Sequence, residues 1–127
     1  MNRTKTVAYW LTTAVIAFVM VSGGAAELAR LQPTTEGMLK LGYPPYVMTI
    51  LGVWKLLGAI VLLVPALPRL KEWAYAGIVF SMTGAVASHV AVGDSARHVL
   101  VPAIFALVAI GSWAFRPAAR TLRPLNQ

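Results

Sequence analysis

Cysteine is absent from this chain of 127 residues. Small four-helix membrane oxidoreductases that pass electrons between thiols and a quinone need a Cys-x-x-Cys pair to attack and resolve disulfides, so this chain cannot carry out that chemistry by itself. The phosphate-binding loop, the dinucleotide-binding glycine pattern, the His-Glu-x-x-His motif and the Gly-x-Ser-x-Gly motif are also missing. These absences remove support for nucleotide-driven work and for the standard hydrolase sites.

Charged residues are scarce as well. They make up 12% of the chain and only 4 of them are acidic, whereas 58% of the residues are hydrophobic. The mean hydropathy is +0.71. Because about 25% of the residues in an ordinary soluble domain are charged, this composition indicates an integral membrane protein.

Long apolar stretches fill most of the sequence, at residues 7–29, 46–64, 73–92 and 99–115. Each is close to the roughly 17–25 residues with which a helix crosses a hydrocarbon core of about 30 Å. Strands of a membrane barrel would instead alternate apolar and polar residues, and these stretches are apolar on all sides. We therefore predict an all-α fold, an integral membrane four-helix bundle, formed as a single domain by residues 1–127.

The first stretch also resembles a secretory signal peptide, since Arg3 and Lys5 precede it and the small residues at 24–26 resemble a cleavage site. Its apolar run is at the long end for such a peptide. We therefore expect it to stay in the chain as a transmembrane helix.

Basic residues predict how the four spans are oriented. The basic residues outside the membrane fall into a larger set on one side and a smaller set on the other. Lys55 lies within the membrane itself. The larger set is Arg3, Lys5, Arg69, Lys71, Arg116, Arg120 and Arg123, and the smaller set is Arg30, Lys40 and Arg97. By the positive-inside rule, both termini should lie in the cytoplasm. The basic C-terminal residues fit contacts with anionic membrane lipid, and we expect no nucleic-acid partner.

Small residues predict which helix faces touch one another. Residues 22–26 are all small, Gly52 and Gly58 lie on the second stretch, and Gly77 and Ser81 are four residues apart on the third. In lipid, helices associate through close packing of small residues, so we expect these faces inside the bundle.

A few polar side chains lie at or near bilayer depth, namely Glu27, Lys55, His89 and Asp94, with Tyr43 and Trp54 close by. Lys55 is near the middle of its stretch, where a lone ammonium is costly unless it is paired or reaches water. Helical side chains lean toward the N-terminus of their helix, and this rule brings Lys55, Glu27 and His89 toward one another in the outer half of the membrane. We expect Lys55 to pair with Glu27 or Asp94, with His89 as a hydrogen-bond partner. The alternative is a Lys55 side chain that extends to water or to a lipid headgroup.

His89 and Trp54 each allow a functional and a structural interpretation. An imidazole titrates near neutrality, so His89 could act as a general acid or base or bond a quinone, or it could only bond a neighbouring hydroxyl or backbone group. Trp54 could form the wall of a cavity for a flat apolar ligand, or it could merely pack.

His89, Asp94 and His98 are metal-ligating residue types, but their spacing matches no established metal site. His98 should also lie at the membrane surface. A haem held by two histidines fits equally poorly, because one histidine is deep and the other shallow. The sequence therefore predicts no metal site.

Several segments of the chain resemble one family of membrane proteins. They are LGYP at 41–44, KLLGA at 55–59, RLKEWAYAG at 69–77 and SHVAVGD at 88–94. The chain resembles the DoxX-like family of small bacterial four-helix membrane proteins over nearly its whole length. The wider DoxX group takes its name from a subunit linked to thiosulfate:quinone oxidoreduction, and some relatives are associated with membrane redox or oxidative-stress systems. The resemblance implies a place in the bacterial cytoplasmic (inner) membrane and a link to membrane redox. The motif positions that are both polar and deep in the membrane are Lys55 and His89, with Asp94 at the outer end.

Three kinds of function fit the sequence. The first is a quinone- or lipid-binding protein associated with membrane redox, in which Trp54 and apolar walls hold a ring while Lys55 and His89 address its carbonyl oxygens. Such a protein has no cofactor in its own chain and needs a membrane oxidoreductase as partner. The second is a small proton-coupled transporter, although exporters of this size use a carboxylate midway along the first helix, where residues 15–18 are apolar. The third is a structural or assembly subunit, alone or as a homo-oligomer, whose polar cluster only fixes helix register.

Overall fold

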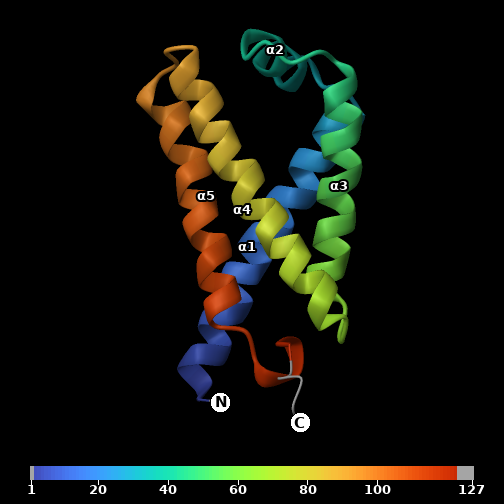
Figure 1. Ribbon diagram of the computed structural model, residues 1–127, viewed down its shortest axis with the longest axis vertical. Coiled ribbons are helices and arrows are strands. Elements are labelled where there is room, and N and C mark those ends of the chain that lie inside the picture. Colours follow the sequence, from blue (N-terminus) through green and yellow to red (C-terminus); the bar gives the residue numbers. More distant parts are fainter. Residues whose placement is uncertain (1, 123–127) are drawn as a thin grey trace.

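The computed structural model describes residues 2–122, and in that range the chain forms helices and no strand. Figure 1 shows five helices and a short 3-10 helix in chain order. They are α1 (Arg3–Leu28), α2 (Gln32–Lys40), α3 (Tyr46–Leu63), α4 (Pro68–Ala91), α5 (Ala96–Ala114) and η1 (Ala118–Arg120). The predicted all-α bundle of four long helices is confirmed.

The four long helices are apolar on the outside of the bundle. Each of α1, α3, α4 and α5 is long and apolar enough to cross a membrane. Large side chains point outward, and Phe18, Phe80 and Leu107 are 73%, 74% and 68% exposed. Apolar surface of this extent is unusual on a soluble monomer but is suited to contact with acyl chains. The chain is a multi-pass membrane protein.

Two of the long helices start earlier than predicted. Helix α4 begins at Pro68 instead of residue 73, and α5 begins at Ala96 instead of residue 99. Proline suits the first turn of a helix, because the N–H that it lacks has no partner there. Both added segments contain charged residues. In each of these helices the helical backbone therefore begins several residues before the apolar pattern does.

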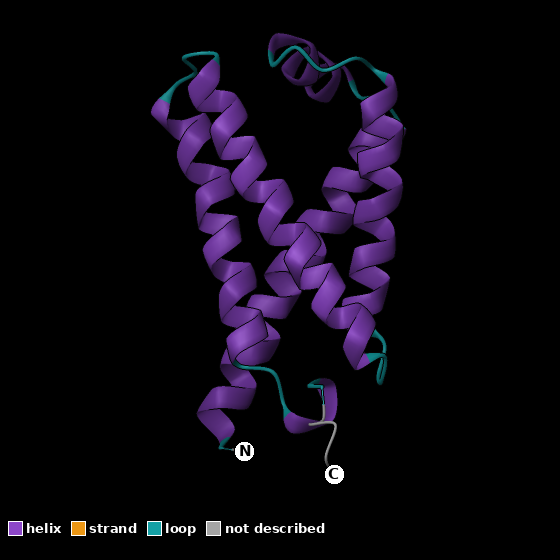
Figure 2. Cartoon of the chain, in the orientation of Figure 1, coloured by secondary structure: helices purple, strands orange, loops and turns teal. Residues whose placement is uncertain are grey.

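Helix α2 was not predicted. It has nine residues, all of them outside the buried core, and it lies at the end of the bundle where α3 begins, level with the α4–α5 turn (Figure 2). Its sequence, QPTTEGMLK, is short and polar and therefore carries no signal of a membrane span.

The bundle is built from two pairs of helices, α1 with α3 and α4 with α5, and α1 also packs against α5 while α3 packs against α4. At the crossing of α1 and α3, a Cβ added to Gly52 would lie 2.9 Å from the carbonyl oxygen of Gly24. These glycines let the two backbones approach closely, as predicted. The prediction is wrong for Gly77, which is exposed and would have nothing within 4 Å of an added Cβ. The α4 face that packs inside is formed by larger side chains, including Tyr75, Ile78 and Met82.

The two ends of the bundle differ in what they contain. Helix α1 starts and α5 ends at the same end, which we name the terminal end; α2 and the α4–α5 turn lie at the opposite end, the loop end (Figure 1). The cytoplasmic location of the terminal end stays a prediction. Arg123, which was counted for that prediction, lies outside the described residues.

At the terminal end, two basic side chains bond the carbonyl groups at the end of α3. The Lys71 side chain donates to the carbonyl oxygens of Val61, at 2.5 Å, and of Val64. Arg120 donates to the carbonyl oxygen of Leu62 at 2.8 Å. The last carbonyls of a helix have no partner within it and carry partial negative charge, so cations are favoured there. Lys71 was assigned to a loop from the sequence, but it lies inside α4 and is 1% exposed.

Candidate functional site

Lys55 of α3 reaches across to α1 and forms an ion pair with Glu27. The side chains are 18% and 7% exposed, respectively. Gly23 makes room for the ammonium, since a Cβ added there would lie 3.6 Å from Lys55 Nζ. Of the two pairings expected from the sequence, the structure therefore has the one with Glu27, and the ammonium does not need to extend to water.

Only one of the two oxygens of the Glu27 carboxylate takes part in this ion pair. One oxygen, Oε1, accepts a hydrogen bond from Lys55, while the buried Oε2 has no hydrogen-bond partner among the described residues. Burying an acceptor without a donor costs about 1–3 kcal/mol. The free oxygen can therefore accept a hydrogen bond from an external donor.

Beside the ion pair, a pocket of about 380 Å³ lies between α3 and α4. Leu57 and Gly58 of α3 and Ile78 of α4 form part of its wall, and Met20 of α1 reaches it. Among the described residues that line it, Lys55 is the one with a charged side chain, and Ser81 of α4 adds a hydroxyl. An apolar pocket with few polar groups can accept an apolar molecule and fix its orientation through them.

Trp54 lines the same pocket, together with Trp73 of α4. Both indole rings are 67% exposed on the outside of the bundle. The structure therefore places Trp54 in the wall of a cavity, one of its two expected positions, with much of the ring turned toward the surrounding lipid.

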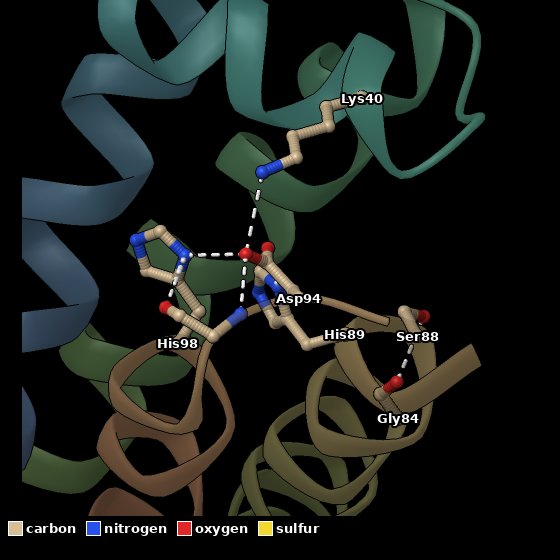
Figure 3. A network of polar contacts seen from close by, with 7 residues as sticks. Lys40, Gly84, Ser88, His89, Asp94 and His98 are labelled. Atoms are coloured by element: carbon tan, nitrogen blue, oxygen red, sulfur yellow. Dashed lines mark hydrogen bonds and ion pairs between the residues drawn. The ribbon is translucent and has the colours of Figure 1, made fainter. Parts of the chain in front are cut away.

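His89 and Asp94 form a second polar cluster, which lies at the loop end (Figure 3). His89 Nδ1 lies 2.8 Å from Asp94 Oδ2, and His98 Nδ1 lies 2.9 Å from Asp94 Oδ1. Lys40 of α2 donates to Asp94 Oδ1 at 3.3 Å. The expected hydrogen bond between His89 and Lys55 is not found: His89 pairs with Asp94, three residues beyond the end of α4, and Lys55 pairs with Glu27.

The carboxyl group of Asp94 is stabilised in its charged form. Hydrogen bonds from His98, from His89 and from the Ser95 amide, together with one from Lys40, hold the pKa of Asp94 well below its usual range. Asp94 is thus a carboxylate with basic groups on several sides.

Tyr43 belongs to the loop end as well. Its hydroxyl lies 2.6 Å from the Ser88 hydroxyl. The Ser88 hydroxyl donates to the carbonyl oxygen of Gly84 at 2.9 Å (Figure 3). This contact ties the segment between α2 and α3 to the last turns of α4. Of the six site residues predicted from the sequence, three (Glu27, Trp54, Lys55) lie at the ion pair or its pocket and three (Tyr43, His89, Asp94) at the loop end.

Sequence analysis missed a buried hydroxyl network in the core of the bundle. Ser112 of α5 lies 2.7 Å from the hydroxyls of both Thr13 of α1 and Tyr75 of α4. All three side chains are at most 3% exposed. Hydroxyl residues are common in membrane helices, where they can bond the backbone of their own helix. The sequence therefore could not distinguish these three from other hydroxyl residues, because only the fold brings them together.

Comparison with curated proteins and with solved structures finds no match. A protein-family model does match. Residues 11–112 fit the model of the DoxX-like family, a range that contains both the Lys55–Glu27 pair and the His89–Asp94 cluster. With four membrane-spanning helices in one bundle and a match over most of its length, the chain belongs to the DoxX-like family.

Proposed function

We propose that this DoxX-like protein binds a membrane-dissolved amphipathic molecule, a quinone in the first place, in the pocket between α3 and α4. The observation that carries the proposal is Lys55, a cation at bilayer depth whose side chain lines a pocket with mostly apolar walls. The inner membrane of a bacterium is the setting that the proposal assumes.

The pocket has a suitable size and polarity for such a ligand. Sites for small molecules commonly have volumes of about 300–1,000 Å³ and apolar walls with few polar groups, and this pocket has about 380 Å³. Trp54 and Trp73 offer flat aromatic faces against which a ring can stack. Since both indoles are exposed on the outside of the bundle, a ligand could enter directly from the lipid.

The ion pair provides the polar groups that would bind the ligand. The Lys55 ammonium has three donor hydrogens, of which Glu27 uses one, so it can also donate to a carbonyl oxygen of a ligand. Glu27 compensates the charge of Lys55, and its free oxygen can take up a proton. These groups bind a ligand and handle protons; electrons would have to come from a membrane oxidoreductase partner, because no side chain in the chain carries them.

Extraction and mass spectrometry test this proposal. The protein is purified in mild detergent, extracted with organic solvent and analysed for quinone and phospholipid, and the same is done for Lys55→Met. The matched control is Lys5→Met, since Lys5 is exposed and far from the pocket in the sequence. Stoichiometric quinone in the native protein and in Lys5→Met, lost in Lys55→Met, is the expected result. Bulk phospholipid alone in all three samples would contradict quinone binding.

A second reading uses the same ion pair. A buried carboxylate oxygen without a partner at bilayer depth also suits a proton-coupled transporter, in which Glu27 would be the proton carrier. Proton uptake into liposomes containing the native protein, abolished by Glu27→Gln, would favour this function over ligand binding.

A further inference from the structure

The turn between α4 and α5 gathers three metal-ligating side chains within ten residues. Helix α4 ends at Ala91, and two residues later Gly93 has a φ of 68°, which glycine adopts without strain. The amide of Asp94 then bonds back to the carbonyl oxygen of His89 at 2.9 Å. Ser95 precedes the first residue of α5, and His98 follows in its first turn. Two helix ends and their caps thus fix the positions of His89, Asp94 and His98.

The donor atoms of these side chains converge on one point (Figure 3). The two imidazoles turn their Nδ1 atoms toward the same carboxylate, and the ligand atoms of all three residues lie within 4.8 Å of one another. The ring centroids of the histidines are 5.5 Å apart. Two nitrogens and one carboxylate oxygen at such distances can coordinate a single ion after small side-chain rotations.

We propose that His89, Asp94 and His98 bind a divalent transition-metal ion of the zinc class at the loop end of the bundle. Imidazole nitrogen with carboxylate oxygen suits Zn²⁺ and its neighbours Co²⁺, Ni²⁺ and Cu²⁺, whereas Mg²⁺ and Ca²⁺ prefer oxygen ligands only. Three protein ligands leave one tetrahedral position open to water or to a further ligand.

The sequence predicted no metal site, because the His-x4-Asp-x3-His spacing matches no established pattern. That spacing spans the end of one helix, a turn and the start of the next, whereas familiar patterns lie on one helix or one hairpin. His98 does lie at the surface, with 53% of its side chain exposed, and a binding site at a surface is accessible to ions from water.

Lys40 of α2 competes with a metal ion for Asp94. Its ammonium donates to Asp94 Oδ1, while 62% of its side chain is exposed and free to move away. A bound cation would repel this ammonium. Metal binding is therefore coupled to the release of the Lys40 end of α2, and the coupling is reciprocal.

Cobalt(II) is the probe for this site, because four-coordinate Co²⁺ absorbs visible light. The chain has only two histidines and no cysteine, so nitrogen ligation of Co²⁺ by an imidazole must involve His89 or His98. The full chain is purified in detergent with an affinity tag that contains no histidine, and Co²⁺ is titrated and then displaced with Zn²⁺. We expect one Co²⁺ per chain with visible absorption that Zn²⁺ abolishes and that Mg²⁺ does not.

Substitutions assign the ligands. His89→Gln, His98→Gln and Asp94→Asn should each weaken binding by more than the roughly 10–100-fold that loss of an outer-shell partner costs. The matched control is Glu36→Gln, which removes an exposed carboxylate of α2 and should leave the affinity unchanged. Far-ultraviolet circular dichroism and the elution volume show whether each variant is folded.

Lys40→Met separates metal coordination from a merely structural role of the cluster. Removal of the competing cation should tighten Co²⁺ binding by roughly two- to fivefold, the size of an interaction between exposed charges. If Lys40→Met damaged the fold, it would weaken Co²⁺ binding instead. Equal affinity of the native chain and a folded His89→Gln/His98→Gln double variant, or binding of Mg²⁺ in place of Zn²⁺, would overturn the proposal.

Discussion

Removing the charge of Lys55 should destabilise the bundle, and removing the charge of Glu27 as well should restore most of the lost stability. Lys55→Met keeps a long flexible side chain that still covers the pocket wall, but it leaves the Glu27 carboxylate without its cation in a place where only 7% of the side chain is exposed. Loss of one partner of a buried ion pair typically costs about 3–5 kcal/mol, while replacement of both partners is often close to neutral.

The structure allows the magnitude to be worked out in a second way. In Lys55→Met, Glu27 Oε1 loses its donor, and the buried Oε2 has no partner among the described residues. Each buried acceptor without a donor costs about 1–3 kcal/mol, and more when it carries charge, which agrees with the range above.

The assay is unfolding by SDS in mixed micelles, followed by circular dichroism and extrapolated linearly to zero denaturant. Native protein, Lys55→Met, Glu27→Gln and the double variant form a double-mutant cycle, with Lys5→Met as the exposed control. We expect a coupling energy of at least about 3 kcal/mol and a double variant within about 1 kcal/mol of the native protein. A coupling energy below about 0.5 kcal/mol would refute this account of the pair.

Three further substitutions test the packing of the bundle in the same unfolding assay. Lys71→Met removes two hydrogen bonds to the end of α3 and should cost about 2–4 kcal/mol, whereas the exposed neighbour Arg69→Met should cost less than about 0.5 kcal/mol. Gly52→Ala places a methyl group 2.9 Å from an α1 carbonyl oxygen and should cost about 1–3 kcal/mol, while Gly84→Ala, with nothing within 4 Å, should not destabilise. Ser112→Ala leaves two buried hydroxyls without their common partner and should cost about 1–3 kcal/mol. Equal losses in Lys71→Met and Arg69→Met, or in the two glycine variants, would contradict these contacts.

The four spans could be predicted because their signal is simple. A run of apolar residues long enough to cross the bilayer needs no knowledge of tertiary structure. Helix α2 could not be found this way, since its residues are polar and none is buried. The early start of α4 was missed for a related reason, because Arg69 and Lys71 make the first turn look like a loop although the backbone is already helical.

The polar residues were identified from the sequence, but their grouping was only partly predicted. Depth and side-chain direction place Lys55 near Glu27, and that pair is present. They say nothing of how α4 is rotated relative to α3, so His89 was expected at Lys55. In the structure His89 contacts Asp94, five residues along the chain, and not Lys55 on another helix. The role of Lys71 was not predicted, because Lys71 bonds carbonyl oxygens at the end of α3, and the sequence does not show that the two lie together.

The two cations at the end of α3 differ greatly in their distance along the chain, and this has a consequence for biogenesis. Lys71 lies seven residues after Val64, so its contact can form as soon as the α3–α4 hairpin has left the ribosome and entered the membrane. Arg120 is separated by 58 residues from Leu62, the carbonyl that it bonds, and it follows the last span. Its contact can form only after α5 has been inserted. A protein tagged or shortened just after α5 should therefore insert normally and yet fail at the last step of assembly, with the end of α3 held by Lys71 alone.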